Sequence, residues 1–232
     1  MALFAIGDIH GHLRSLKALL DTHEYSSEDV VVFLGDYVDK GPEVAGTLDA
    51  LVKLSDRPNF IFLRGNHDQL FLDACLDSTR VSLWECLAGD APLASYGSGD
   101  TRDLLASIPD AHIHFLRDRC QDYYETDEFI LVHGGIQQHL APKEDDIDHL
   151  HWLTLSMAAP HFSGRTVVCG HSSQESGRIA DLGHTICIDT GITKRGAITC
   201  LNLDDFSFTQ STEDGMTSRG VLQHRSVPQS WS

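Results

Sequence analysis

Five apolar runs along this chain each end in a loop that combines glycine with aspartate, asparagine or histidine. The runs and their loops, in chain order, read FAIGDIH, VFLGDYVD, FLRGNHD, ILVHGG and VVCGH. In an α/β sheet, the loops at the carboxyl ends of parallel strands point the same way and form the ligand site. This recurrence therefore constrains the fold, because it predicts that the five polar loops converge on one place.

Each motif alone also has a structural interpretation. A Gly-Asp pair after a strand is commonly a turn or the N-cap of a helix. A single histidine at a strand end, such as His133 or His171, is more often hydrogen-bonded to its surroundings than a ligand. The repetition of one chemical type at five strand ends favours a shared site over five unrelated turns.

Strand-like and helical patterns alternate in the first third of the chain. Strand patterns cover 3–8, 30–36 and 60–68, and amphipathic helical patterns cover 13–22 and 43–54. This βαβαβ order predicts a parallel sheet with helical crossovers. From about residue 122, short strand patterns dominate and favour an antiparallel or mixed sheet. We therefore expect an α/β fold of two packed sheets with helices outside.

The pattern indicates one globular domain followed by a tail. With 232 residues, of which 41% are hydrophobic and 22% charged, the chain is long enough to bury one sizeable core. We place this domain at 1–210. Residues 211–232 are polar and aperiodic, so a mobile C-terminal tail is predicted there.

The charge balance limits the partners of the protein. A formal net charge of −17 argues against binding to duplex nucleic acid, because a surface that follows phosphates is expected to be basic. It does not argue against a phosphorylated substrate, since local cations or bound metal ions dominate the field of a site. A phosphorylated protein or a small phosphorylated molecule remains compatible with this composition.

Cysteine usage and the N-terminus indicate the compartment. The six cysteines are widely spaced and form no CxxC pair, which favours reduced, buried thiols. The start, MALFAIGDIHG, lacks the charged and apolar regions of a signal peptide, and no apolar run approaches a membrane span. A cytoplasmic protein without a membrane partner is expected, and the sequence does not indicate an oligomeric state.

Six of the loop residues are candidate metal ligands, and they offer two carboxylates, one amide oxygen and three imidazoles: Asp8, His10, Asp36, Asn66, His133 and His171. This set suits two divalent ions such as Mn²⁺, Fe or Zn²⁺ rather than a structural zinc ion, which favours cysteine. Six side chains cannot fill two coordination spheres, so water and substrate complete them, as in a catalytic site. Asp36 is the carboxylate best placed to bridge ions roughly 3.5–4 Å apart.

The blocks GDIHG, GDYVDKG, RGNHD, LVHGG and CGH, in that order, resemble the five signature blocks of the phosphoprotein phosphatase branch of the calcineurin-like metallophosphoesterases. The resemblance covers roughly 3–205 and is greatest to the bacterial and bacteriophage serine/threonine phosphatases. It implies a catalytic domain with a four-layer α/β/β/α sandwich, made of two mixed sheets flanked by helices. It also implies a dinuclear centre, with Mn²⁺ as the favoured ion, whose first metal is held by Asp8, His10 and Asp36. The second metal would be held by Asp36, Asn66, His133 and His171.

The same resemblance suggests catalytic roles for three further residues. His67 follows the ligand Asn66 and would act as general acid, while Asp39 orients its ring and raises its pKa. Arg64 matches the position of a phosphate-binding arginine, and its planar guanidinium suits two phosphate oxygens. Two divalent ions lower the pKa of a shared water towards neutrality, so no protein base is required.

The sequence departs from the family pattern at two basic positions. Lys40 stands where relatives usually have arginine, which keeps the charge but loses the bidentate geometry. Bacterial and phage relatives tend to carry an arginine two residues after a tryptophan, whereas Trp152 is followed at that spacing by Thr154. Lys194 and Arg195, just after IDTG, are candidate substitutes, although a solvated turn explains them equally well.

Three functions follow from these motifs. The first is a metal-dependent phosphomonoesterase that acts as a serine/threonine protein phosphatase. The alternative is a symmetrical dinucleoside tetraphosphate hydrolase, which shares the five blocks, although 37 residues between His133 and His171 leave little wall for two nucleosides. A binding module on an inactivated phosphoesterase fold is the third, and the presence of all six ligands and His67 argues against it.

Overall fold

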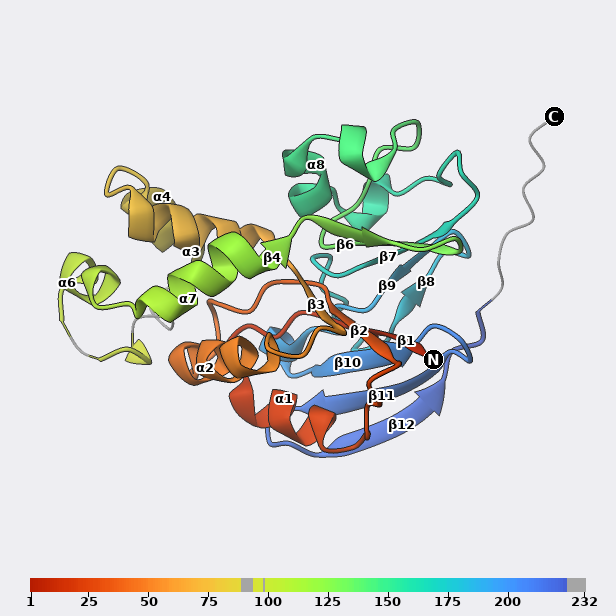
Figure 1. The fold of residues 1–232 in the computed structure, drawn as a ribbon, viewed down its shortest axis with the longest axis horizontal. Coiled ribbons are helices and arrows are strands. Elements are labelled where there is room, and N and C mark those ends of the chain that lie inside the picture. Colours follow the sequence, from red (N-terminus) through yellow and green to blue (C-terminus); the bar gives the residue numbers. More distant parts are fainter. Residues whose placement is uncertain (89–93, 98, 225–232) are drawn as a thin grey trace.

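Two β-sheets pack face to face in the computed structural model, which describes residues 1–88, 94–97 and 99–224 (Figure 1). The first sheet has the strand order β12-β11-β10-β1-β2-β3-β4, and the second has the order β5-β6-β7-β9-β8. The strands of the first sheet are β1 (Leu3–Ile6), β2 (Val30–Phe33), β3 (Phe60–Leu63), β4 (Cys120–Gln121), β10 (Ala197–Asn202), β11 (Ser207–Thr212) and β12 (Thr217–Val221). Those of the second are β5 (Tyr123–Glu125), β6 (Phe129–Val132), β7 (Thr166–Cys169), β8 (Ala180–Asp181) and β9 (Thr185–Cys187).

Helices cover the outer faces of both sheets. Along the chain they are α1 (Leu13–Leu20), α2 (Val44–Leu54), α3 (Asn66–Leu76), α4 (Val81–Ala88), α6 (Thr101–Ala106), α7 (Asp110–His114) and α8 (Ile147–Trp152). Shorter helical turns are η1 (Phe115–Arg119), η2 (Pro142–Glu144), η3 (Leu155–Met157) and η4 (Ile192–Lys194). In Figure 1, α1 to α4 and α7 gather beside the first sheet, and α8 lies beyond the second.

Three hydrophobic clusters separate the four layers, because alternate residues of a strand face opposite sides of its sheet. In β2, Val31 and Phe33 pack towards helices α1 to α4, whereas Val32 packs between the two sheets. In β6, Leu131 faces the space between the sheets and Ile130 packs towards α8. The predicted sandwich of two mixed sheets flanked by helices is confirmed.

The strand directions bring the polar loops together. β1, β2, β3 and β4 run parallel, and so do β6, β7 and β9. Backbone hydrogen bonds join the loops beyond the strands, from His10 N to Asp36 O (2.8 Å) and from Gly170 N to His133 O (2.8 Å). The carboxyl ends of the five motif-bearing strands therefore meet at one edge of the sandwich.

The prediction of a mobile tail from residue 211 is wrong for the described part of that segment. Ser211 and Thr212 complete β11, and β12 pairs with it in antiparallel register from Ser211↔Thr217 to Ser207↔Val221. The Arg219 guanidinium also donates to Thr22 O at 2.8 Å. An exposed edge strand has no buried face, so it lacks the alternating pattern by which strands are found. Residues 225–232 lie outside the described residues.

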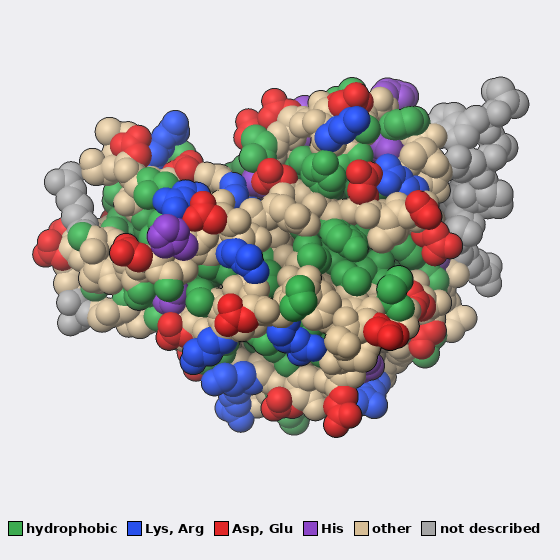
Figure 2. All heavy atoms as spheres, in the orientation of Figure 1, with side chains coloured by type: hydrophobic (Ala, Val, Ile, Leu, Met, Phe, Trp, Pro, Cys, Tyr) green, Lys and Arg blue, Asp and Glu red, His purple; other side chains and the backbone are tan. Residues whose placement is uncertain are grey.

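On the face shown in Figure 2, acidic and basic side chains both lie around the rim. Among the helices of the described residues, none combines the length and apolar character needed to cross a bilayer.

Candidate metal centre

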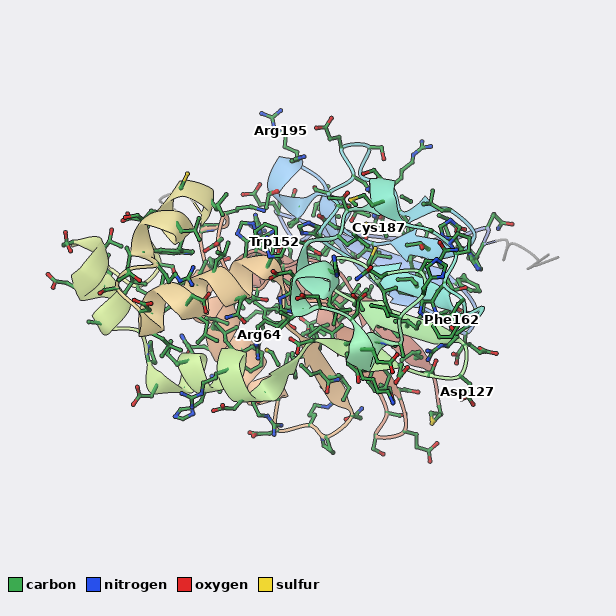
Figure 3. All side chains as sticks on the ribbon, turned by 90° about the horizontal axis from the view of Figure 1, so that it is seen from above. Arg64, Asp127, Trp152, Phe162, Cys187 and Arg195 are labelled. Carbon is green, nitrogen blue, oxygen red and sulfur yellow. The ribbon has the colours of Figure 1, made fainter. Side chains whose placement is uncertain are left out.

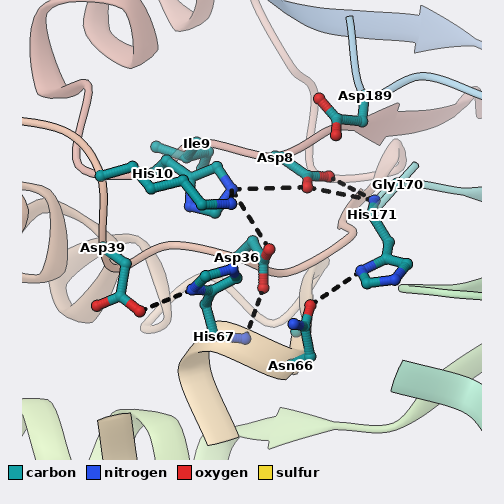
Figure 4. A network of polar contacts seen from close by, with 12 residues as sticks. Asp8, Ile9, His10, Asp36, Asp39, Asn66, His67, Gly170, His171 and Asp189 are labelled. Atoms are coloured by element: carbon teal, nitrogen blue, oxygen red, sulfur yellow. Dashed lines mark hydrogen bonds and ion pairs between the residues drawn. The ribbon is translucent and has the colours of Figure 1, made fainter. Parts of the chain in front are cut away.

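Five loops deliver their polar side chains to one buried cluster (Figure 4). Asp8 and His10 follow β1, Asp36 and Asp39 follow β2, Asn66 and His67 begin α3 after β3, His133 follows β6 and His171 follows β7. All are buried except His171, which is half-buried. One ligand atom each from Asp8, Asp36 and His133 lies within 4.8 Å of the other two. The predicted convergence is present.

Asp36 lies between two groups of nitrogen donors. Its Oδ2 is 3.4 Å from His10 Nε2, and its Oδ1 is 3.3 Å from His133 Nε2. The two oxygens of one carboxylate thus face two different imidazoles. This is the arrangement that a carboxylate bridging two cations requires.

Backbone carbonyls determine which imidazole nitrogens face the centre. His10 Nδ1 and His133 Nδ1 each lie 2.8 Å from a carbonyl, that of Val38 and of Leu34 respectively. A carbonyl only accepts, so both Nδ1 atoms carry the proton and both Nε2 atoms keep a lone pair. Burial also lowers the pKa of His10 and of His133 to about 3. Both rings are therefore neutral and present Nε2, rather than Nδ1, to the centre.

Acceptor atoms face one another around Asn66. Its Oδ1 lies 2.9 Å from His133 Nε2 and 3.0 Å from His171 Nδ1. Since the proton of His133 is on Nδ1, its Nε2 has none to donate to this oxygen. A cation between these lone pairs would turn a repulsive contact into ligation.

Carboxyl groups also gather at the centre. Burial, together with the nearby carboxylates of Asp189 and Asp36, raises the pKa of Asp8 well above its ordinary range. Oxygen and imidazole donors without thiolate suit hard or borderline divalent ions. The donor set therefore fits a metal centre.

Backbone strain is concentrated at the site. His10 (φ +44°), Asp36 (φ +52°), Asp39 (φ +65°), Lys40 (φ +63°) and His171 (φ +60°) all adopt the left-handed region. Non-glycine residues rarely occupy it, and they do so mainly where the surroundings enforce a functional geometry.

Two glycines allow the carboxylates to approach the backbone. A Cβ atom on Gly65 would collide with Asp36 Oδ1, and one on Gly170 would collide with Asp8 Oδ1. Glycine in the RGNHD and VVCGH motifs is thus required by the carboxylates of two other loops.

His67 and Asp39 form a buried pair. His67 Nδ1 lies 2.7 Å from Asp39 Oδ2, and Trp84 Nε1 donates to Asp39 Oδ1 at 3.0 Å. Burial lowers the pKa of His67, but the charge of Asp36 and the hydrogen bond to Asp39 outweigh it, so the pKa is raised. The predicted pairing is present, and His67 Nε2 is the nitrogen left for a substrate.

Two aspartates that were not predicted as site residues support the centre. Asp68 accepts hydrogen bonds from the N–H groups of Tyr37 (2.8 Å) and Gly65 (2.9 Å) and so joins the loops after β2 and β3. Asp189 follows β9, is 5% exposed and accepts from Gly191 N at 3.0 Å. The run TICIDTG that carries Asp189 has the same glycine-plus-aspartate signal as the five motifs, so sequence reasoning had the means to find it.

Most N–H groups of Arg64, which is expected to bind phosphate, are engaged within the protein. Its Nε donates to Leu116 O at 3.1 Å and its Nη1 to Gln69 Oε1 at 2.9 Å. Its Nη2 donates to Arg117 O and Cys120 O, both at 3.1 Å. Four hydrogen bonds thus engage the guanidinium, three to backbone carbonyls of η1 and the start of β4 and one to Gln69 of α3, which explains an arginine here without phosphate.

The other predicted basic residues divide into two groups. Lys40 reaches the centre, where its Nζ lies 3.1 Å from His10 Nε2. Lys194 and Arg195 are exposed on the surface, Lys194 lies 3.6 Å from Glu175, and Arg195 extends away from the ribbon (Figure 3). Lys40 alone of these three reaches the ligand cluster.

Comparison with known proteins identifies the family. Residues 1–190 match the model of the calcineurin-like phosphoesterases. Because this match covers most of the chain, the protein belongs to the calcineurin-like phosphoesterase family, a family of metal-dependent hydrolases.

Two curated relatives are bis(5'-nucleosyl)-tetraphosphatases. The symmetrical enzyme of Paracidovorax citrulli is 41% identical over 137 residues, which are 59% of this chain and 45% of that protein. The asymmetrical enzyme PrpE of Oceanobacillus iheyensis is 23% identical over an alignment of 241 positions that covers 90% of this chain and 91% of that protein. The chain thus spans less than half the length of the first relative and most of the second.

A solved structure supports the fold. A cold-active protein tyrosine phosphatase superposes with a TM-score of 0.60 at 19% identity, covering 98% of this chain and 80% of that chain.

Proposed function

We propose that the protein hydrolyses a dinucleoside tetraphosphate, with symmetrical cleavage into two nucleoside diphosphates. The observation that supports hydrolysis at a dinuclear centre is Asp36, whose two oxygens face two separate nitrogen donors. The substrate is supported by the two relatives, both of which are named as tetraphosphatases. The alternative function is thus better supported than the serine/threonine phosphatase first expected, which stays a prediction.

The chain's own residues would hold two divalent cations, with Mn²⁺ as our first choice and Fe or Zn²⁺ as alternatives. Asp8, His10 and Asp36 would hold one ion, and the other would be held by Asp36, Asn66, His133 and His171. Bound ions of this kind supply Lewis acidity, which lowers the pKa of water towards neutrality and offsets charge on phosphate oxygens.

The remaining steps belong to protein side chains. Water adds across the central P–O–P linkage, and the leaving phosphate oxygen requires a proton or an equivalent charge. His67, held through Nδ1 by Asp39 at 2.7 Å, presents Nε2 as the proton donor. Lys40 would exchange its contact with His10 for a phosphate oxygen of the substrate.

The test uses metal-stripped protein resupplied with Mn²⁺. Initial rates are compared on diadenosine tetraphosphate and on a phosphothreonine peptide, and the nucleotide products are separated by anion exchange. Faster nucleotide turnover with ADP as the product supports the proposal. AMP and ATP as products would contradict symmetrical cleavage, and faster peptide turnover would favour the protein phosphatase. No turnover with metals bound would favour the binding module.

A further inference from the structure

A groove lies between the segment after α8 and the residues that follow His171. It measures about 550 Å³, a size within the range of about 300–1,000 Å³ typical of small-molecule sites. Leu155, Ala158 and Leu182 form its apolar wall, and Thr154 and Ser156 contribute hydroxyl groups. The catalytic residues described above do not use this groove.

The groove adjoins the loop that carries the candidate ligand His171. Ser172, which lines it, directly follows the candidate ligand His171. The Ser172 hydroxyl accepts a hydrogen bond from Leu155 N at 2.7 Å, so the loop after β7 is fixed to η3. The groove is therefore the neighbouring surface into which a group attached to a metal-bound phosphate would extend.

The lining of the groove points to an uncharged ligand group. Among the described residues that line it, none carries a charge. Thr154 is the position at which bacterial protein phosphatases tend to carry an arginine, and here it presents a hydroxyl 2.9 Å from the Ser156 hydroxyl. Hydroxyl groups beside an apolar wall suit a ribose and a base better than another phosphate.

Trp152 supplies an aromatic surface next to the candidate ligand His171, two residues before Thr154 of the groove. It ends α8, is 42% exposed, and its ring lies edge-on to His171 with a centroid distance of 6.0 Å. Figure 3 shows it near the middle of the molecule rather than at the periphery. An indole that is exposed beside a phosphate-binding centre is available to stack on a nucleobase.

We infer that this groove, with Trp152 at its entrance, binds one nucleoside of the substrate. The inference rests on the proposed function, because it assigns the nucleoside of a dinucleoside polyphosphate to a specific wall of the same site. One short segment, from Trp152 to Ala158, then forms most of the nucleoside site. This answers the concern that only 37 residues separate His133 from His171.

The experiment compares two ligands that differ only in the nucleoside. Binding of ADP and of methyl diphosphate to Mn²⁺-loaded protein is measured by calorimetry, which requires no turnover. We expect ADP to bind at least about tenfold more tightly, because stacking of one base contributes about 1–3 kcal/mol. Trp152→Ala should remove most of this preference and Trp152→Phe should keep it.

Two further variants control the result. Ile147→Ala changes another exposed apolar residue of α8 that is not among those lining the groove, so both affinities should match those of the wild type. Leu182→Ala changes a residue of the apolar wall that lies on another segment of the chain. It should weaken the binding of ADP a few-fold more than the binding of methyl diphosphate. It tests the groove independently if Trp152→Ala does not fold.

Three outcomes would overturn the inference. The first is that the wild type binds ADP and methyl diphosphate with equal affinity. The second is that Trp152→Ala weakens the binding of both ligands equally. The third is that a phosphothreonine peptide binds more tightly than ADP and that Trp152→Ala abolishes this binding. The last outcome would assign the groove to a peptide. The proposed function is judged separately by turnover of diadenosine tetraphosphate, so failure of one is distinguishable from failure of the other.

Discussion

The ligand cluster and the rim around it differ in how the fold holds their side chains. Asp8, Asp36 and His133 are buried, and backbone groups from neighbouring loops fix their orientation. Lys194 and Trp152 are exposed on short segments and have few partners. The proposed centre, which would hold two dications close together, needs rigid ligands, whereas a rim that is to admit the proposed substrate needs accessible ones. The difference indicates that the buried cluster carries the proposed chemistry, whereas the exposed rim carries the proposed selection of substrate.

The largest expected effect concerns the bridging carboxylate. Asp36→Asn keeps the shape of the side chain but removes the charge shared by the two candidate sites. We expect the hydrolysis rate to fall by about 10³-fold or more, because metal ions supply several kcal/mol of transition-state stabilisation. Metal content measured by mass spectrometry should fall with the rate.

A matched control for this variant is Asp127→Asn, an exposed aspartate of the β5–β6 turn at the periphery (Figure 3). It should keep both metal and rate. Full metal content in Asp36→Asn would show that the carboxylate does not bridge.

The second effect separates proton transfer from metal binding. His67→Asn should keep the metals but lower the rate on phenyl phosphate by about 10²-fold, since general acids contribute about 10²–10⁴-fold. The loss should be much smaller on 4-nitrophenyl phosphate, whose leaving group needs little protonation. Rates on the two esters and metal content are measured on one preparation. Equal losses on both esters would contradict the general-acid role of His67.

The third effect distinguishes a structural arginine from a phosphate ligand. Arg64→Ala leaves the carbonyls of Leu116, Arg117 and Cys120 without their donors. We expect the free energy of unfolding in urea to fall by about 2 kcal/mol, with KM for diadenosine tetraphosphate nearly unchanged. Arg178→Ala, at an exposed arginine, should leave stability unchanged. A large rise in KM without a loss of stability would restore the phosphate role to Arg64.

The sequence predicted the centre far better than the rim, for a physical reason. A ligand at a strand end is visible locally, because the apolar strand, the glycine and the polar residue are adjacent, as in VFLGD. The backbone partners of Arg64 lie more than 50 residues further along the chain, in η1 and at the start of β4, so no local pattern shows them. Strand β12 was missed because neither of its faces is buried.

The fourth effect concerns Lys40, which shares properties of both regions. It stands in a strained loop of the centre, yet its side chain is exposed and contacts only His10 in the described structure. Lys40→Ala should raise KM about tenfold through loss of one phosphate contact, about 1.4 kcal/mol. Lys40→Arg should keep the affinity, because arginine binds phosphate in two-pronged geometry. An unchanged KM in both variants would contradict a contact between Lys40 and a phosphate of the substrate.

The smallest effect is expected at the η4 turn. Lys194 is 49% exposed at its side chain, and its partner Glu175 is 86% exposed, so their ion pair at 3.6 Å contributes little. Lys194→Ala should therefore change KM for diadenosine tetraphosphate by less than about twofold. A tenfold rise would show that the η4 turn moves over the substrate and that the rim, although exposed, is organised by ligand binding. Steady-state kinetics should be measured at low salt, where an effect of Lys194 on KM is largest because the screening of exposed charges is weakest.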